Sequence, residues 1–177
     1  PEQKVDEKKD TVCFRGNPLT YTEYEYYLFH KPAGCVTATE DNLHRTVMDY
    51  LTDTARHDLF PVGRLDIDTE GLLITNDGAL AHDLLSPAKH VSKVYYAKID
   101  GRVTEEDVNL FENGVDIGEE KPTKPALLEV LHSGDNSEIR LTITEGRFHQ
   151  VKRMFDAVGK KVTYLKRVEM GSLVLPD

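Results

Sequence analysis

Cysteine is scarce in this chain of 177 residues, which contains only Cys13 and Cys35. This pair provides neither a disulfide framework nor the CxxC spacing of a zinc-binding knuckle. We therefore expect no structural metal centre of that kind. A reducing cytoplasm is the simplest compartment for such a chain.

Long apolar runs are also missing. No stretch of eighteen apolar residues occurs, so no membrane span is predicted. The first ten residues, PEQKVDEKKD, lack the apolar core of a secretion signal. A hydrophobic content of 39% with 30% charged residues is typical of a globular protein with one sizeable core, or one domain in two lobes. Because the chain starts with Pro1 rather than Met, we expect it to be a fragment.

Positive charge is the third shortage, because 22 Lys and Arg residues face 31 Asp and Glu residues, a net charge of −9. Taken alone, this balance argues against binding of nucleic acid. The distribution differs from the average, since residues 144–167 hold seven basic and two acidic residues, a local balance of +5. This segment predicts one electropositive surface that attracts a polyanion. The alternative is a solvated helix face followed by a charged edge strand.

Several catalytic and cofactor motifs are absent as well. The chain has no P-loop, no GxGxxG and no GxSxG, so neither a nucleotide cofactor nor a serine nucleophile is indicated. His30, His44, His90 and His149 are too scattered in the sequence to suggest a metal site.

One segment offers an alternative as a calcium site. Residues 66–77 place acidic side chains and a glycine at the spacing of an EF-hand loop. The twelfth position, however, is Asp77 rather than the usual bidentate Glu. Pro61 and Gly63 also make the long entering helix unfavourable. We therefore regard calcium binding as the weaker interpretation.

Hydrophobic periodicity predicts more strands than helices. The expected fold class is α+β with a largely antiparallel sheet. Strands are expected at 24–30, 35–39, 59–65, 71–78 with a turn at 76–78, 93–100, 138–144, 161–168 and 172–175, and helices at 46–51, 79–85, 105–112 and 148–158.

The segment 148–158 carries the clearest helical pattern. Lys152 lies on the border of its apolar stripe, from which its side chain can reach a half-buried site. Gly159 follows as the expected end of the helix. The predicted stripe consists of Phe148, Val151, Met154, Phe155 and Val158.

The stretch GRLDIDTEGLLITNDG, Gly63–Gly78, is the most informative one. It sets Arg64 and Asp66 where a predicted strand runs into a polar turn. A cation beside a carboxylate on such a loop suits an enzyme that acts on a phosphate-linked substrate. Seen alone, the tripeptide favours the commoner interpretation, in which Asp66 is a turn or capping carboxylate.

Five blocks of sequence, in order along the chain, carry a resemblance to a known family. With them the chain resembles the RsuA family of pseudouridine synthases, and most closely the members that act on the small ribosomal subunit. The blocks are HKPAGCV (30–36), GRLDIDTEGLLITNDG (63–78), SPAKHVSKVY (86–95), TKPALLEV (123–130) and RLTITEGRFHQVKRMF (140–155).

The resemblance implies a fold and an activity. The fold would be the pseudouridine synthase fold, a mixed and mostly antiparallel sheet in two lobes with flanking helices. The activity would be isomerisation of a specific uridine to pseudouridine in small-subunit (16S) ribosomal RNA, with no cofactor. The partner would be that RNA or a small-subunit assembly particle, and the protein would be a cytoplasmic monomer. The alternatives are a large-subunit ribosomal RNA pseudouridine synthase of the same family and a non-catalytic RNA-binding assembly factor.

The same resemblance assigns roles to individual residues. Asp66 would be the catalytic carboxylate, Lys152 its basic partner and Tyr95 the aromatic residue near the target ring. Arg64 would help to displace and hold the flipped nucleotide. Further candidates for RNA contact, for which simple surface exposure is the alternative, are Lys31, Arg147, His149, Gln150 and Arg153.

Domain organisation follows from the part of the family pattern that the chain contains. Residues 1–22 are expected to be the remnant of an N-terminal S4-type RNA-binding module plus a linker. Residues 23–177 would form the catalytic domain, and we expect its C-terminal tail to be truncated.

Overall fold

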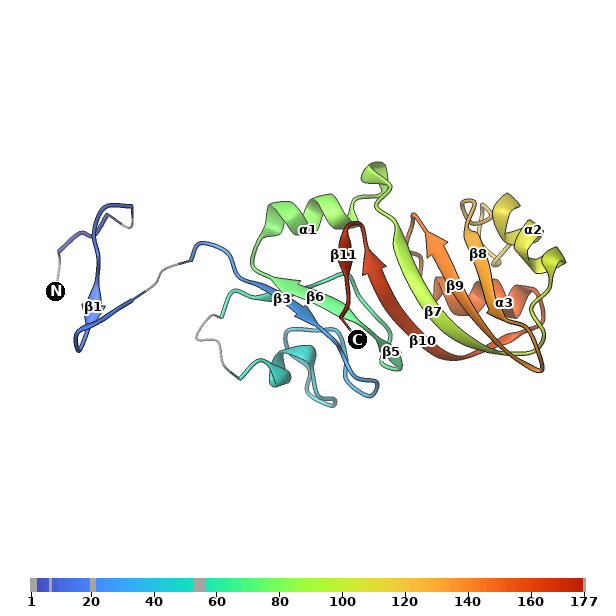
Figure 1. Ribbon diagram of the computed structural model, residues 1–177, viewed down its shortest axis with the longest axis horizontal. Helices are drawn as coiled ribbons and strands as arrows, with labels where there is room; N and C mark the ends of the chain where they lie inside the picture. The colour runs from blue at the N-terminus through green and yellow to red at the C-terminus, as the bar shows by residue number, and fades with distance from the viewer. Residues whose placement is uncertain (1–2, 7, 20–21, 53–56, 177) are drawn as a thin grey trace.

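The computed structural model describes residues 3–6, 8–19, 22–52 and 57–176. An N-terminal hairpin comes first, formed by β1 (Cys13–Phe14) and β2 (Asn17–Pro18), and Figure 1 shows it apart from the rest of the chain. Every described residue from 3 to 19 is exposed. The assignment of residues 1–22 to a remnant of an RNA-binding module stays a prediction.

A small antiparallel sheet follows, in which β6 (Leu72–Thr75) lies between β3 (Tyr26–Phe29) and β4 (Phe60–Val62). Helix α1 (Gly78–Leu85) comes directly after β6, and Asp77 caps its first turn by accepting from the Leu80 amide. The predicted helix at 46–51 is the short 3₁₀ helix η1 (Val47–Tyr50).

The strand predicted at 35–39 is wrong. This segment forms only an isolated bridge between Val36 and Thr46. The physical reason lies in Thr37, because its hydroxyl donates to the Leu65 carbonyl at 2.8 Å and accepts from the Leu65 amide at 3.2 Å. The segment thus supports the loop after β4 instead of extending a sheet.

The large sheet has the order β11-β10-β7-β9-β8, and β5 (Thr69–Glu70) runs parallel to β10 at a branch of this sheet. Its antiparallel strands are β7 (Lys93–Asp100), β8 (Leu127–His132), β9 (Asn136–Ile143), β10 (Lys161–Met170) and β11 (Leu173–Val174). Strand β7 has the bounds expected from the sequence, whereas β8 was not predicted. Outside the strands lie η2 (Pro87–Lys89), α2 (Glu105–Asn113) and α3 (Gln150–Ala157), and Figure 1 shows α2 and α3 near the β8 and β9 end of the sheet. The predicted α+β class with a mixed, mostly antiparallel sheet is confirmed.

Helix α3 begins two residues later than its sequence pattern predicts. His149 adopts a left-handed conformation with φ of +49°, so the helix cannot include it. Phe148 therefore leaves the predicted apolar stripe, and 74% of it is exposed. Val151, Met154 and Phe155 remain buried as expected.

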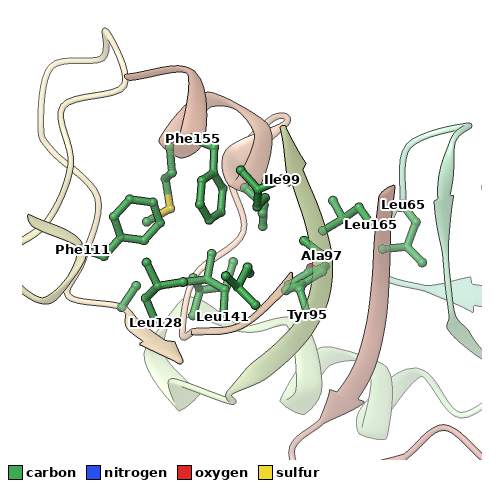
Figure 2. Close-up of a cluster of buried hydrophobic side chains, with 14 of the residues drawn as sticks. Leu65, Tyr95, Ala97, Ile99, Phe111, Leu128, Leu141, Phe155 and Leu165 are labelled. Atoms are coloured by element: carbon green, nitrogen blue, oxygen red, sulfur yellow. The ribbon is translucent and has the colours of Figure 1, made fainter. Parts of the chain in front are cut away.

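One hydrophobic core connects the two sheets. The Phe111 and Phe155 rings, 5.0 Å apart between centroids, pack α2 against α3 at one end of it. At the other end Leu65, in the loop after β4, lies near Leu165 of β10 (Figure 2). The small and large sheets therefore share this main core, in which the loop between β4 and β5 is anchored. A smaller cluster packs α1 between β4 and β10 and consists of Val62, Ala81 and Met170. No helix in the described ranges is long and apolar enough to cross a membrane.

Gly71 lies where the segment that joins β5 to β6 passes close to the backbone of strand β10. Its φ is +85°, and a Cβ there would overlap the Arg167 carbonyl oxygen. We expect Gly71→Ala to lower the free energy of unfolding by about 3 kcal/mol, since both backbone strain and a backbone collision oppose it. Urea unfolding curves measure this loss.

Gly118→Ala is the matched control, because Gly118 has a similar φ of +76° and an added Cβ would have no atom within 4 Å. The control should lose only about 1 kcal/mol. Equal losses for the two variants would contradict the close contact at Gly71.

Candidate active site

A cleft of about 910 Å³ lies between the loop after β4, the first residues of β7 and the segment that leads into α3. Its size suits a nucleotide-sized ligand, since small-molecule sites are typically about 300–1,000 Å³. Five basic side chains and three carboxylates line it, so its balance is +2 within a chain of −9. The cleft thus has a positive balance of charge, whereas the chain as a whole is negative. These side chains are Arg64, Lys93, Arg147, Lys152 and Arg167, and Asp41, Asp66 and Glu145.

The side chain of Lys31 supports the loop that carries Asp66 through hydrogen bonds to its backbone. The Lys31 Nζ donates to the carbonyl oxygens of Thr69 at 2.8 Å, Ile67 at 3.1 Å and Pro32 at 3.2 Å. Two of these carbonyls belong to the turn that follows Asp66, in which the Thr69 amide donates to the Asp66 carbonyl. Buried Leu65 fixes the other side of the aspartate. The position of the carboxylate is therefore set by the scaffold.

Lys31 is fully buried, which corrects the prediction that it contacts RNA. Burial lowers the pKa of its ammonium group, although the nearby carboxylates of Asp68, Asp66 and Glu70 favour the charged form. A buried lysine needs acceptors for its donors, and the three carbonyl oxygens provide them. Lys31 is thus a structural residue of the Asp66 loop.

Asp66 meets two side chains from the other side of the cleft. Lys152 Nζ lies 3.0 Å from Asp66 Oδ2, and His149 Nε2 lies 3.3 Å from Asp66 Oδ1. The Asp66 side chain keeps 25% of its surface exposed, so a ligand in the cleft has access to it. The structure therefore brings together the aspartate and the lysine singled out in the sequence.

Asp68 is a second carboxylate on Lys152, and the sequence analysis did not select it. The Lys152 Nζ lies 2.6 Å from Asp68 Oδ1. Burial disfavours the Lys152 ammonium group, but its hydrogen bonds to Asp68 and Asp66 outweigh that effect and raise its pKa. Lys152 is therefore a permanently charged partner of Asp66 at neutral pH. The signal in the sequence that could have identified Asp68 is its position two residues after Asp66.

Among the three carboxylates that line the cleft, Asp66 is the one left for chemistry. Asp41 accepts from the backbone amides of Leu43 and His44. Glu145 accepts from the Lys124 amide and from two side chains next to it. Both are thus used to shape loops, whereas the Asp66 carboxylate contacts the Lys152 and His149 side chains of the opposite wall.

Tyr95 and Arg64 both line the cleft, but in different environments. Tyr95, in β7, is 8% exposed and belongs to the core cluster that Figure 2 draws. Arg64 is exposed, and no carboxylate within the described ranges pairs with its guanidinium group. Tyr95 is thus a fixed part of the floor, whereas Arg64 is a free cation at the rim.

Three other predicted RNA contacts are occupied by protein partners. Arg147 pairs with Glu145 and Glu119 and donates to two backbone carbonyls, and Arg153 pairs with Glu119 as well. Gln150 is buried, and its amide group binds Glu145 and the Arg147 backbone. These side chains therefore hold the segment before α3 in place. The positive surface predicted from residues 144–167 is neutralised in part, since four of its seven basic residues pair with carboxylates: Arg147, Lys152, Arg153 and Lys160.

Phe148 and His149 form an exposed aromatic stack at the cleft. Their ring centroids are 3.8 Å apart with planes 19° from parallel. The left-handed backbone of His149 turns Phe148 away from the core, and both residues line the cleft. The helical spacing predicts a buried Phe148, so this pair could not be predicted from the sequence as a surface for a flat ligand.

The calcium-loop alternative does not fit the backbone. Residues 69–70 and 72–75 of the twelve-residue segment are strands rather than a chelating loop. Asp77 caps α1. Asp66 and Asp68 instead bind Lys152.

Comparison with known proteins shows the family to which the chain is similar. Residues 25–157 match the family described as RNA pseudouridylate synthase. The chain is 48% identical over 177 residues to an RNA pseudouridine synthase of Bacillus subtilis (strain 168) described as uncharacterised, covering 98% of this chain and 74% of that protein. It is 42% identical over 167 residues to ribosomal small subunit pseudouridine synthase A of Escherichia coli (strain K12), covering 93% of this chain and 71% of that protein. A crystal structure of a pseudouridylate synthase superposes with a TM-score of 0.81 at 37% identity, covering 98% of this chain and 74% of that chain.

The buried ammonium group of Lys31 gives a stability prediction. We expect Lys31→Met to lower the free energy of unfolding by about 2–5 kcal/mol, because three carbonyl oxygens would lose their donor. Lys89→Met is the control, since Lys89 is exposed and pairs with the exposed Asp83, and it should change stability by less than about 1 kcal/mol. Differential scanning calorimetry compares the two, and equal melting temperatures would contradict the role of Lys31.

Proposed function

This chain belongs to the RNA pseudouridylate synthase family, whose members isomerise uridine to pseudouridine in RNA, and from that premise we propose that its target is a uridine of small-subunit ribosomal RNA. Support for this target comes from 42% identity, over more than nine-tenths of the chain, to enzymes named for the small ribosomal subunit. The substrate is the RNA itself or an assembly particle that exposes it. A large-subunit target is the alternative that an assay must exclude.

Asp66 is the proposed catalytic carboxylate, and its contact with Lys152 at 3.0 Å in an open cleft is the observation that carries this assignment. The reaction breaks the N1–C1′ bond of uridine and forms a C5–C1′ bond. The proton on C5 is lost and N1 gains one, so no electrons or phosphoryl groups enter. A carboxylate serves as nucleophile or base in glycosidic chemistry, and either role needs its ionised form.

The residues around Asp66 have complementary proposed roles. The proposed role of Lys152 is to orient the Asp66 carboxylate through their contact at 3.0 Å. A uridine inside a folded RNA must leave its stack, at a cost of about a few kcal/mol. Arg64 has no carboxylate partner in the described part of the chain, so it is free to fill the vacated space and meet phosphate. Tyr95 offers its ring from the floor of the cleft.

The Asp66 assignment predicts a specific loss of activity. Asp66→Asn should reduce pseudouridine formation about a thousandfold or more. The fold and RNA binding should persist, because the substitution replaces one carboxylate oxygen by an uncharged amide nitrogen of similar size. Asp68→Asn is the matched control, since it removes the other carboxylate on Lys152. The control should keep activity within about tenfold of the wild type.

The measurement is pseudouridine formation in purified small-subunit ribosomal RNA of the source organism, with RNA affinity and circular dichroism alongside. Turnover by Asp66→Asn at the wild-type rate would refute a catalytic Asp66. A wild type that itself forms no product, while it still binds the RNA, would instead indicate a non-catalytic RNA-binding factor.

Phe148 is the proposed stacking surface for an RNA base at the cleft entrance. Base–aromatic stacking is typically worth about 1–3 kcal/mol, so Phe148→Ala should weaken RNA binding about 5- to 150-fold. Its stability should be unchanged because the side chain is exposed. Leu131→Ala, which removes an exposed apolar side chain from β8, should bind RNA like the wild type. Equal affinities of both variants, measured by fluorescence anisotropy, would exclude the stacking role.

A further inference from the structure

Two buried cations in the cleft have no acidic partner among the described residues. Lys93, in β7, is 8% exposed and Arg167, in β10, is 5% exposed. Both line the same cleft as Asp66. Lys93 Nζ reaches only the Val91 carbonyl, at 3.4 Å, and Arg167 Nη2 donates to the Val62 carbonyl at 3.3 Å. Neutral acceptors of this kind leave both charges uncompensated.

The register of the large sheet puts these cations on one face. Tyr95 of β7 pairs with Arg167 of β10, and Lys93 precedes Tyr95 by two residues on the same strand. Side chains two apart on a strand point to the same face, so Lys93, Tyr95 and Arg167 share the floor of the cleft. The chain at Gly63 passes close to this floor, because a Cβ on Gly63 would lie 3.2 Å from Arg167 Nη1. The segment that leads to Arg64 and Asp66 thus borders the pair.

Burial of two like charges side by side is costly for the fold. Burial, and then the charge of Arg167, lower the pKa of Lys93. An unpaired buried charge costs several kcal/mol, and removal of such a group is often neutral or stabilising. The other cations differ, because Lys152 and Arg147 are held by carboxylates and Arg64 is exposed. A negatively charged ligand would offset the free-energy cost of burying the positive charges of Lys93 and Arg167.

We propose that Lys93 and Arg167 form a phosphate-binding subsite, which takes a backbone phosphate beside the uridine that enters the cleft. This inference rests on the proposed function, since phosphodiesters are the anionic groups of an RNA substrate. A guanidinium group binds two phosphate oxygens at once, and the lysine adds a point charge. A phosphate would favour the charged form of Lys93, against the effects of burial and of the Arg167 charge.

Salt dependence of RNA binding tests the subsite. Each phosphate contact on a single strand contributes about 0.7 to the slope of log affinity against log salt concentration. Lys93→Met should therefore lower the slope by about 0.7 and weaken binding about tenfold or more at low salt, without loss of thermal stability. Lys98→Met is the matched control, because Lys98 is an exposed residue of the same strand, and it should bind like the wild type. An unchanged slope and affinity in Lys93→Met would overturn the proposal.

A pair of small ligands tests the recognised group directly. Uridine 3′,5′-bisphosphate should bind the wild type about tenfold or more tightly than uridine does, and should raise the pKa of Lys93 as measured by NMR of labelled lysine. Lys93→Met should lose this preference. Equal binding of both ligands by the wild type, or an intact preference in the variant, would contradict a phosphate subsite.

Different results would contradict the proposed function and the phosphate subsite. A wild type that prefers the bisphosphate through Lys93, yet forms no pseudouridine in RNA, contradicts the proposed function and leaves phosphate binding in place. A wild type that forms pseudouridine, while Lys93→Met keeps the salt slope and the ligand preference, overturns the subsite alone.

Discussion

The buried ammonium group of Lys31 is the constraint on which the candidate site depends. It donates to three carbonyl oxygens around the Asp66 loop, and two of them, those of Ile67 and Thr69, belong to the turn after the aspartate. A loop normally owes its mobility to solvated backbone groups, whereas here those groups are satisfied by a charge inside the protein. The carboxylate is therefore fixed before any ligand arrives, as preorganised catalysis requires.

The cations that line the cleft fall into two groups, those that pair with carboxylates and those that do not. Cations that pair with carboxylates, such as Lys152 and Arg147, hold the side chains and loops of the site in place. Cations without such partners in the described ranges, Lys93, Arg64 and Arg167, keep their charge for a ligand. An acidic protein can thus bind a polyanion, because only the unpaired cations of one concave surface need to face it.

Much of the fold could be predicted from the sequence, and the failures have physical causes. Strand β7 alternates clearly and is found at 93–100. Lys152 was placed on the border of its helix, and its ammonium group does face the cleft. The burial of Lys31 was missed because its carbonyl partners come from residues 36 and 38 positions away. The neutralisation of Arg147 and Arg153 was missed for the same reason, since Glu119 reaches them from a distant loop. Phe148 fits a helical stripe by spacing, but the left-handed His149 removes it from the helix.

The central claim is that this cleft isomerises a uridine of small-subunit ribosomal RNA. The most direct measurement is a map of pseudouridines in both ribosomal RNAs from cells of the source organism that lack this protein. The account predicts that one pseudouridine disappears from the small-subunit RNA and returns when the wild-type gene is restored. An unchanged small-subunit map, or a loss confined to the large-subunit RNA, would contradict it.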